Sequence, residues 1–203
     1  FSADRGGSPL LPGSATVLPP AVVAVFVWAS AMSPSMFSPP TLSRLNDVVF
    51  NSDYRLVSSL DAWTMAFGFG LQIYFDFSGY VDMATGSALM LNIVLPQNFN
   101  SPLKATSVID FWQRWHITLS TFLTNYIYYP LSRSFKDLTF TKSMLITMIV
   151  FLIAGLWHGP SWLFVTFGGL HGLGLILNHI YKKLSTFELN KVLSIFLTFN
   201  YVN

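Results

Sequence analysis

The 203-residue sequence contains no cysteine, which excludes disulfides, thiolate metal ligands and a cysteine nucleophile. Charged residues are scarce as well: they make up 10% of the chain, against about 25% in typical soluble domains. The net charge of +2 is small and the basic residues form no run, so the electrostatic signature of a nucleic-acid-binding protein is missing. These shortages exclude a soluble globular domain and a nucleic-acid partner.

Hydrophobic residues are abundant, at 52% of the chain, and they predict an all-α, polytopic transmembrane protein. The most apolar region carries no Asp, Glu, Lys or Arg between Lys142 and Lys182. Its two halves, 143–157 and 161–181, are separated by His158-Gly159-Pro160, a step that ends a helix. Basic residues flank this region on both sides, so we predict a hairpin whose two ends are cytoplasmic.

The break at His158 falls short of a full membrane crossing. A helix over 143–157 rises only ~22 Å, whereas the hydrocarbon core is roughly 30 Å thick. Non-helical backbone inside a bilayer is tolerated only within protein or beside a water-filled cavity. We therefore predict that His158 lies on the wall of an aqueous funnel.

Two uncharged stretches, 62–75 and 83–103, are joined by "FDFSGYVDM", which carries Asp76 and Asp82. We predict two helices, joined or kinked at Ser78-Gly79. The two carboxylates are six positions apart and do not share a helical face. Two interpretations of them remain open: a proton relay or acceptor-binding pair, and side chains that pair with arginines or cap broken helix ends.

Residues 107–131 mix aromatic and charged side chains in one helical stretch. Asp110 and Arg114 are spaced i, i+4 with the acid first, the favourable order on a helix. We predict one interfacial or buried helix that Pro130 ends. Its tryptophans and tyrosines, Trp115 among them, are predicted to form an interfacial belt, with stacking on a sugar as the alternative.

All four histidines lie in the second half of the chain. An ionisable residue at membrane depth is a functional hypothesis by default, and a histidine that merely packs needs no helix break beside it, so His158 is favoured. His116 is balanced between function and packing, while His171 and His179 are predicted to pack. The histidine spacing fits no compact metal site, and no G-x-S-x-G motif is present. We therefore predict that a neutral His158 acts as general base on a hydroxyl, which then attacks a thioester.

Four motifs follow one another in the sequence: "QIYFDFSGYVDMATG" (72–86), "NFNSPLKATSVIDFWQRWHITLS" (98–120), "YIYYPL" (126–131) and "AGLWHGPSWLFVTFGGLHG" (154–172). Together they resemble the membrane-bound O-acyltransferase (MBOAT) family. The branch that they resemble most is the bacterial alginate O-acetyltransferase type, which is related to the teichoic-acid D-alanyl transferase.

The resemblance implies a multi-pass enzyme of the bacterial inner membrane that moves an acyl group to a hydroxyl. The catalytic histidine of the family's "WHG" motif falls on His158, and the functionally important histidine of "RWH" falls on His116. The implied core is a ring of helices, some broken or re-entrant, around a funnel that narrows at the catalytic histidine.

The expected donor is acetyl-CoA or another acyl thioester, with no bound cofactor or metal. The expected acceptor is an exported polysaccharide or a periplasmic acetyltransferase partner. The residues assigned to substrate binding are Trp157, Asp76, Asp82, Trp115 and Arg114.

The same motifs divide the chain into three parts. Residues 1–44 are expected to be a loop and one short apolar helix, 45–181 the catalytic region, and 182–203 a tail or truncated next segment. Because the chain starts with Phe1 and has no signal-peptide pattern, we expect a fragment. Two other functions stay open: a transporter or channel subunit with a broken-helix substrate path, and a non-catalytic scaffold of a polysaccharide-export complex.

Overall fold

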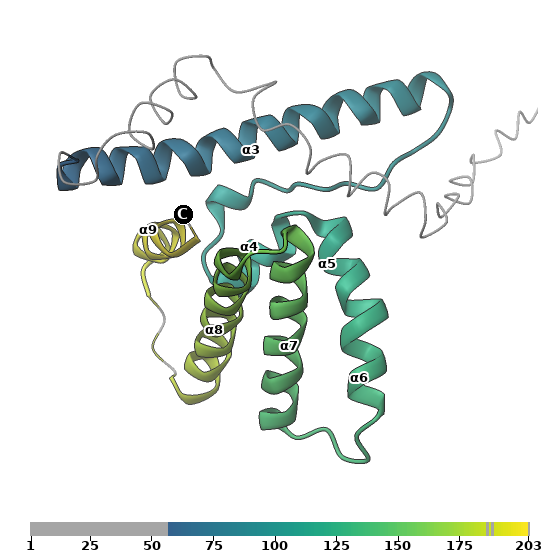
Figure 1. Ribbon diagram of the computed structural model, residues 1–203, viewed down its shortest axis with the longest axis vertical. Helices are drawn as coiled ribbons and strands as arrows, with labels where there is room; N and C mark the ends of the chain where they lie inside the picture. The colour runs from purple at the N-terminus through teal and green to yellow at the C-terminus, as the bar shows by residue number, and fades with distance from the viewer. Residues whose placement is uncertain (1–56, 186, 188, 203) are drawn as a thin grey trace, which may run out of the picture.

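The computed structural model describes residues 57–185, 187 and 189–202, and regular structure in these ranges is helical throughout (Figure 1). The predicted all-α class is confirmed. The short apolar helix predicted within 1–44 lies outside the described residues. The elements, in chain order, are α3 (Ser59–Met90), η1 (Pro102–Lys104), α4 (Val108–Arg114), α5 (Ile117–Leu123), η2 (Thr124–Tyr128), α6 (Tyr129–Arg133), α7 (Phe140–His158), α8 (Trp162–Leu184) and α9 (Lys191–Val202).

The α7–α8 hairpin is the centre of the fold, and it confirms the helix–turn–helix predicted over 143–181. Within the described residues, these two helices are long and apolar enough to cross a membrane. They approach closely because glycines face each other: a Cβ on Gly168 would lie 3.1 Å from Gly155 Cα and would overlap the carbonyl oxygen of Phe151. Small residues of this kind allow helix backbones to pack in a bilayer, where hydrophobic attraction between helices is absent.

Helix α7 starts three residues before the predicted segment. With 19 residues it rises ~28 Å, close to the roughly 30 Å of a hydrocarbon core. The end of α7 at His158 therefore lies nearer to the opposite surface of the hydrocarbon core than the end of a helix over 143–157 would. The depth of this end within a bilayer stays a prediction.

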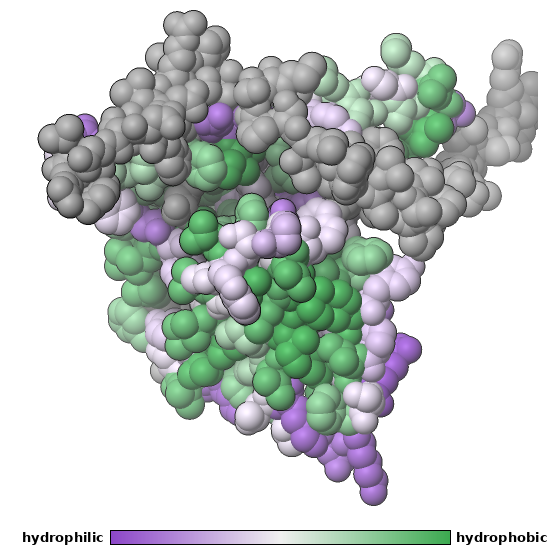
Figure 2. Space-filling view, in the orientation of Figure 1, coloured by the Kyte–Doolittle hydropathy of each residue, from purple (hydrophilic) through white to green (hydrophobic). Residues whose placement is uncertain are grey.

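Hydrophobic and hydrophilic side chains separate along the hairpin. Figure 2 shows a hydrophobic face over α7 and α8, with hydrophilic residues gathered at the α6–α7 loop. That loop and the C-terminal end of α8, with Lys182 and Lys183 in its last turn, lie at the same end of the hairpin (Figure 1). This arrangement fits the predicted cytoplasmic location of both ends.

Helix α3 is one continuous helix of 32 residues, so the break predicted at Ser78-Gly79 is wrong. A single glycine costs a helix only about 1 kcal/mol, and the Ser78 hydroxyl is satisfied locally by the carbonyl of Phe75 at 3.5 Å. The helix instead ends at Met90, and Asn92, two residues later, is left-handed with φ 58°. The N–H groups of Asn92 and Ile93 bond back to the carbonyls of Leu89 and Ala88, which is a Schellman ending.

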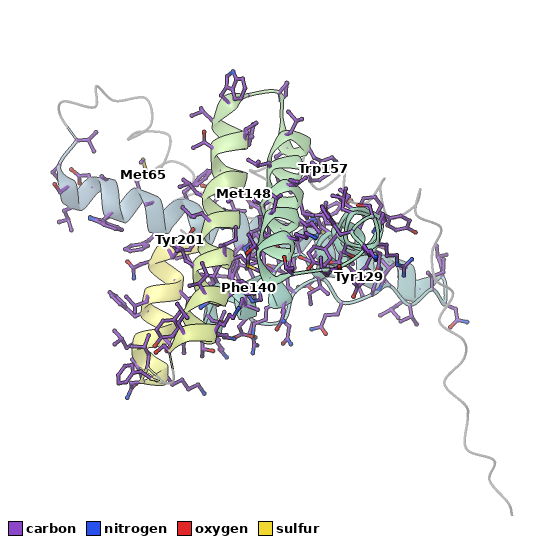
Figure 3. All side chains as sticks on the ribbon, turned by 90° about the horizontal axis from the view of Figure 1, so that it is seen from below. Met65, Tyr129, Phe140, Met148, Trp157 and Tyr201 are labelled. Carbon is purple, nitrogen blue, oxygen red and sulfur yellow. The ribbon has the colours of Figure 1, made fainter. Side chains whose placement is uncertain are left out.

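The single helix predicted over 107–131 is also wrong, because the chain is broken at Trp115-His116 into α4 and α5. Beyond α5 the chain passes through the π-helical η2 and continues as α6, with Pro130 in the first turn of α6. Proline is tolerated there because the first N–H groups of a helix have no intrahelical partner. Helix α3 runs crosswise to the hairpin in both ribbon views (Figures 1 and 3).

Candidate active site

The turn between α7 and α8 places His158 at the last position of α7. The turn is short because Ser161 caps α8, its hydroxyl accepting the N–H of Leu163 at 3.3 Å. The imidazole of His158 is exposed, and its ring centroid lies 4.9 Å from that of Trp157 and 6.4 Å from that of Phe167. Trp157 lies near the turn end of α7 and Phe140 near the opposite end (Figure 3). His158 is thus accessible and is held among aromatic rings.

A cavity of about 240 Å³ opens beside His158, between the hairpin and the α4–α5–η2 segment. His158 and His171 both line it, together with Trp112 and Phe167. The ring of His171 is 4.4 Å from that of Phe167 and 5.3 Å, edge-on, from that of Trp112. The prediction that His171 packs is confirmed by its 7% exposure, although it packs as part of a cavity wall.

His116 forms the joint between α4 and α5 in a left-handed conformation, with φ 43° and ψ 54°. This region is unusual for a residue with a side chain, and such residues cluster at functional sites. The conformation is held from several sides. The N–H of Ile117 donates to the backbone carbonyl of Asn98 at 3.0 Å. The imidazole bonds the Asn98 side chain through Nδ1 at 3.0 Å and meets the ring of Phe77 edge-on at 4.7 Å.

The structure brings the two predicted histidines together. His116 is only 5% exposed, and burial lowers its pKa from 6.5 to about 3, with the nearby His158 adding to the decrease. The proximity of a second imidazole disfavours charge on His116, because two like charges would then face each other. His116 is therefore neutral throughout the physiological pH range.

The depressed pKa of His116 predicts a stability loss in mild acid. A chain that unfolds at pH 5 binds a proton at His116 that the folded protein excludes, so stability is present above pH 6.5 and falls as the pH drops toward 3. Between pH 6.5 and 5 the expected loss is on the order of 2 kcal/mol. Thermal unfolding of the full-length protein in detergent at both pH values measures it. A His116→Gln variant should lose less stability over that interval, and an equal loss would contradict the assignment.

Two of the residues assigned to substrate binding are engaged in packing. Trp115 stacks on Phe111 at 5.6 Å and 16°, and its ring also meets Phe99 edge-on at 5.1 Å. Arg114 donates from Nε to Asp110 at 2.7 Å, the predicted i, i+4 pair, and from Nη1 to the carbonyl of Asn100 at 3.2 Å. Burial alone would raise the pKa of Asp110, but the Thr106 N–H and the Arg114 guanidinium lower it overall.

The remaining assigned residues lie on α3 and at the end of α7. Asp76 is buried on α3 and Asp82 is exposed further along the same helix, consistent with their different faces. Trp157 lies directly beside His158. In the described part of the chain, no three His, Asp or Glu side chains form a group suited to a metal ion.

Sequence reasoning missed Asn98 altogether. This residue is 9% exposed and lies in the extended segment after α3. In the sequence it is only the first residue of the motif over 98–120, between Gln97 and Phe99, and no local pattern marks it as a partner of His116. The role of Trp112 as a wall of the cavity was missed too, because nothing in its spacing separates a cavity wall from an interfacial belt.

The family profile decides the identity of the chain. The model of the membrane-bound O-acyltransferase family matches residues 9–178, which include His116, His158 and the residues that line the cavity beside His158. This chain belongs to the MBOAT family. As an MBOAT protein with two apolar helices of membrane-spanning length, it is a membrane protein. The division of the chain at residues 45 and 182 stays a prediction.

Relatives of this MBOAT chain have names that refer to peptidoglycan, alginate and teichoic acid. It is 45% identical over 151 residues to the peptidoglycan O-acetyltransferase of Helicobacter pylori, covering 72% of this chain and 28% of that protein. Identity to the Probable alginate O-acetylase AlgI of Pseudomonas aeruginosa is 42% over 144 residues, covering 70% and 26%. Identity to the teichoic acid D-alanyltransferase of Streptococcus thermophilus is 30% over 156 residues, covering 66% and 37%. The chain thus spans less than two fifths of the length of these relatives.

Proposed function

We propose that the full-length protein is an O-acyltransferase of the bacterial inner membrane that transfers an acetyl group from a thioester donor to a hydroxyl of an exported polysaccharide, or to a relay partner. The observation that carries this proposal is that His158 lines a cavity at the end of α7 and has His116 close to it. Family membership supports the reaction class, and the names of the relatives, which refer to peptidoglycan and alginate, support a polysaccharide as acceptor.

His158 is the general base of the proposed reaction. Its imidazole takes the proton of the acceptor hydroxyl while the hydroxyl oxygen attacks the thioester carbonyl carbon. A carbon–oxygen bond forms, the carbon–sulfur bond breaks, and the proton passes from His158 to the departing thiolate. The exposed imidazole at the end of α7 suits this role because both substrates can reach it.

His116 has a different part in the same reaction. Being buried and neutral, it is not a source of positive charge at the site. It is suited to accept a hydrogen bond from the acceptor and so to orient it toward His158. The cavity lined by Trp112, Phe167 and His171 lies next to the reacting groups and fits a small acyl group.

The proposal is tested with the full-length protein in proteoliposomes. Labelled acetyl-CoA is supplied on one side and a soluble glycan acceptor on the other, and the labelled ester on the glycan is measured. We expect acetyl transfer that requires both substrates and is removed by mild alkali. Glycan flux across the vesicle without acetyl transfer would favour a transporter and overturn the proposal. Acetyl-phosphopantetheine on a carrier protein, tested in parallel, identifies the thioester if CoA is not the carrier.

A further inference from the structure

The side chain of Asn98 lies at the centre of a small buried hydrogen-bond network at the joint between α4 and α5. Its Oδ1 atom lies 3.2 Å from the backbone N–H of Thr118, 3.0 Å from the Thr118 hydroxyl and 3.0 Å from Nδ1 of His116. Both Asn98 and His116 are less than a tenth exposed, so water does not substitute for these contacts. The hydrogen-bond partners of Asn98 and His116 therefore determine how the amide is oriented and which imidazole nitrogen carries the hydrogen.

The backbone N–H of Thr118 fixes the orientation of the Asn98 amide. A main-chain N–H is only a donor, so the Asn98 atom facing it is the carbonyl oxygen and not the NH₂ group. That oxygen is only an acceptor, and an unprotonated Nδ1 would place two lone pairs face to face at 3.0 Å. Nδ1 of His116 must therefore carry the hydrogen. In a neutral imidazole this leaves Nε2 with the free lone pair.

The backbone supports the same arrangement. Asn98 also accepts the N–H of Ile117 through its main-chain carbonyl, so one residue holds both the chain and the ring of His116. The imidazole of His116 is nearly perpendicular to the ring of Phe77, with the two ring centroids 4.7 Å apart, and this contact further limits its rotation. Among the described residues, Nε2 of His116 makes no hydrogen bond, so its lone pair has no partner within this part of the protein.

We propose that Asn98 is a positioning residue that holds His116 in the Nδ1-protonated tautomer, so that Nε2 accepts a hydrogen bond from a hydroxyl of the acceptor substrate. The proposal rests on the acyl-transfer function. The two histidines then have different roles. His158 removes the proton of the reacting hydroxyl, and His116 orients the acceptor by accepting a hydrogen bond and donates none to the substrates. The oxyanion that develops on the thioester carbonyl must then be stabilised by a group other than His116.

Two substitutions at Asn98 in the full-length protein separate the tautomer from packing. Asn98→Leu keeps the approximate size and removes the acceptor, and it should lower kcat/KM at least tenfold with His116 shifting to the other tautomer. Asn98→Asp keeps an acceptor oxygen in place, so it should preserve the tautomer and much of the rate. Its negative charge should also raise the pKa of His116 and add an acidic limb to the pH–rate profile. Thr121→Val, which removes a hydroxyl on α5 that donates only to the carbonyl of Ile117 at 2.8 Å, is the matched control with a near-parental rate.

The tautomer itself is measured by nitrogen NMR of histidine-labelled protein in liposomes, with the His116 signals assigned by their loss in His116→Gln. Protonated Nδ1 and bare Nε2 in the parent protein, reversed in Asn98→Leu, are the expected result. A parent His116 protonated on Nε2, or an Asn98→Leu variant with the same tautomer and rate, would overturn the proposal. So would equal losses in Asn98→Leu and Asn98→Asp without any change in the pH profile. Because the NMR result does not need turnover, the correct tautomer in a protein without acyl transfer would remove the proposed function alone.

Discussion

Replacing His158 with glutamine in the full-length protein should lower acyl transfer by about 10²–10⁴-fold, the usual contribution of a positioned general base. Glutamine retains polarity and approximate size but does not take a proton from a hydroxyl at neutral pH. His158 lies at the end of α7, exposed, so the substitution leaves the hairpin packing unchanged. The rate is measured as labelled acetyl transferred to acceptor, normalised to the amount of protein in the membrane.

The matched control for this variant is His179→Gln. His179 lies on α8 toward the opposite end of the hairpin and outside the cavity, so its loss should leave transfer within about twofold of the parent. A His158→Gln protein with normal membrane levels and undiminished transfer would remove His158 from the reaction. Equal losses in both variants would point to a general effect on folding instead.

Replacing Gly168 with alanine should destabilise the hairpin by about 1–3 kcal/mol, the usual penalty of overpacking. The added Cβ would overlap the backbone carbonyl of Phe151 and approach Gly155, and backbone atoms do not move aside as a flexible side chain does. Separating α7 from α8 also displaces His158 relative to His116, so transfer should fall as well. Thermal unfolding in detergent and the transfer rate are the two measurements.

Gly169 provides the control for Gly168. A Cβ there would meet only Leu152 Cδ2 at 3.5 Å, an ordinary contact. Both substitutions gain the same helix propensity over glycine, so the difference between them isolates the backbone clash. Gly169→Ala should unfold at or slightly above the parental temperature. If the two variants unfold together, close contact at Gly168 does not hold the hairpin.

The hairpin was predictable from sequence because its signals are local and strong. A long uncharged stretch and a helix-breaking Gly159-Pro160 step define two helices and the turn between them. The same turn identified His158 as the leading candidate. Its accessibility and its place on a cavity wall agree with that prediction, although its role in the chemistry stays a proposal.

The breaks elsewhere were mispredicted because tertiary contacts override local propensity. Ser78-Gly79 carries the local pattern of a break, yet α3 continues through it. Trp115-His116 carries no such pattern, yet the chain turns there. The reason is Asn98, 18 residues earlier, which accepts hydrogen bonds from the backbone and ring on the far side of the joint. No periodicity within 107–131 contains that information.

The aromatic and charged residues near His116 show a related limit. Composition predicted that Trp115 lies at an interface or binds a sugar, whereas it stacks within a cluster that includes Phe99 and Phe111. The Asp110–Arg114 pair was predictable because i, i+4 spacing is a property of the helix itself. Contacts within one helix follow from spacing, while contacts between segments require the fold.

The central claim is that His116 and His158 serve one site, and a double-mutant cycle on the transfer rate tests it most directly. Full-length proteins carrying His116→Gln, His158→Gln and both substitutions are compared at pH 7 with acetyl donor and glycan acceptor. Residues that act as a unit show strongly non-additive losses. The double variant should therefore be little slower than His158→Gln alone. Losses that multiply, as expected for independent residues, would show that the two histidines do not act in the same step.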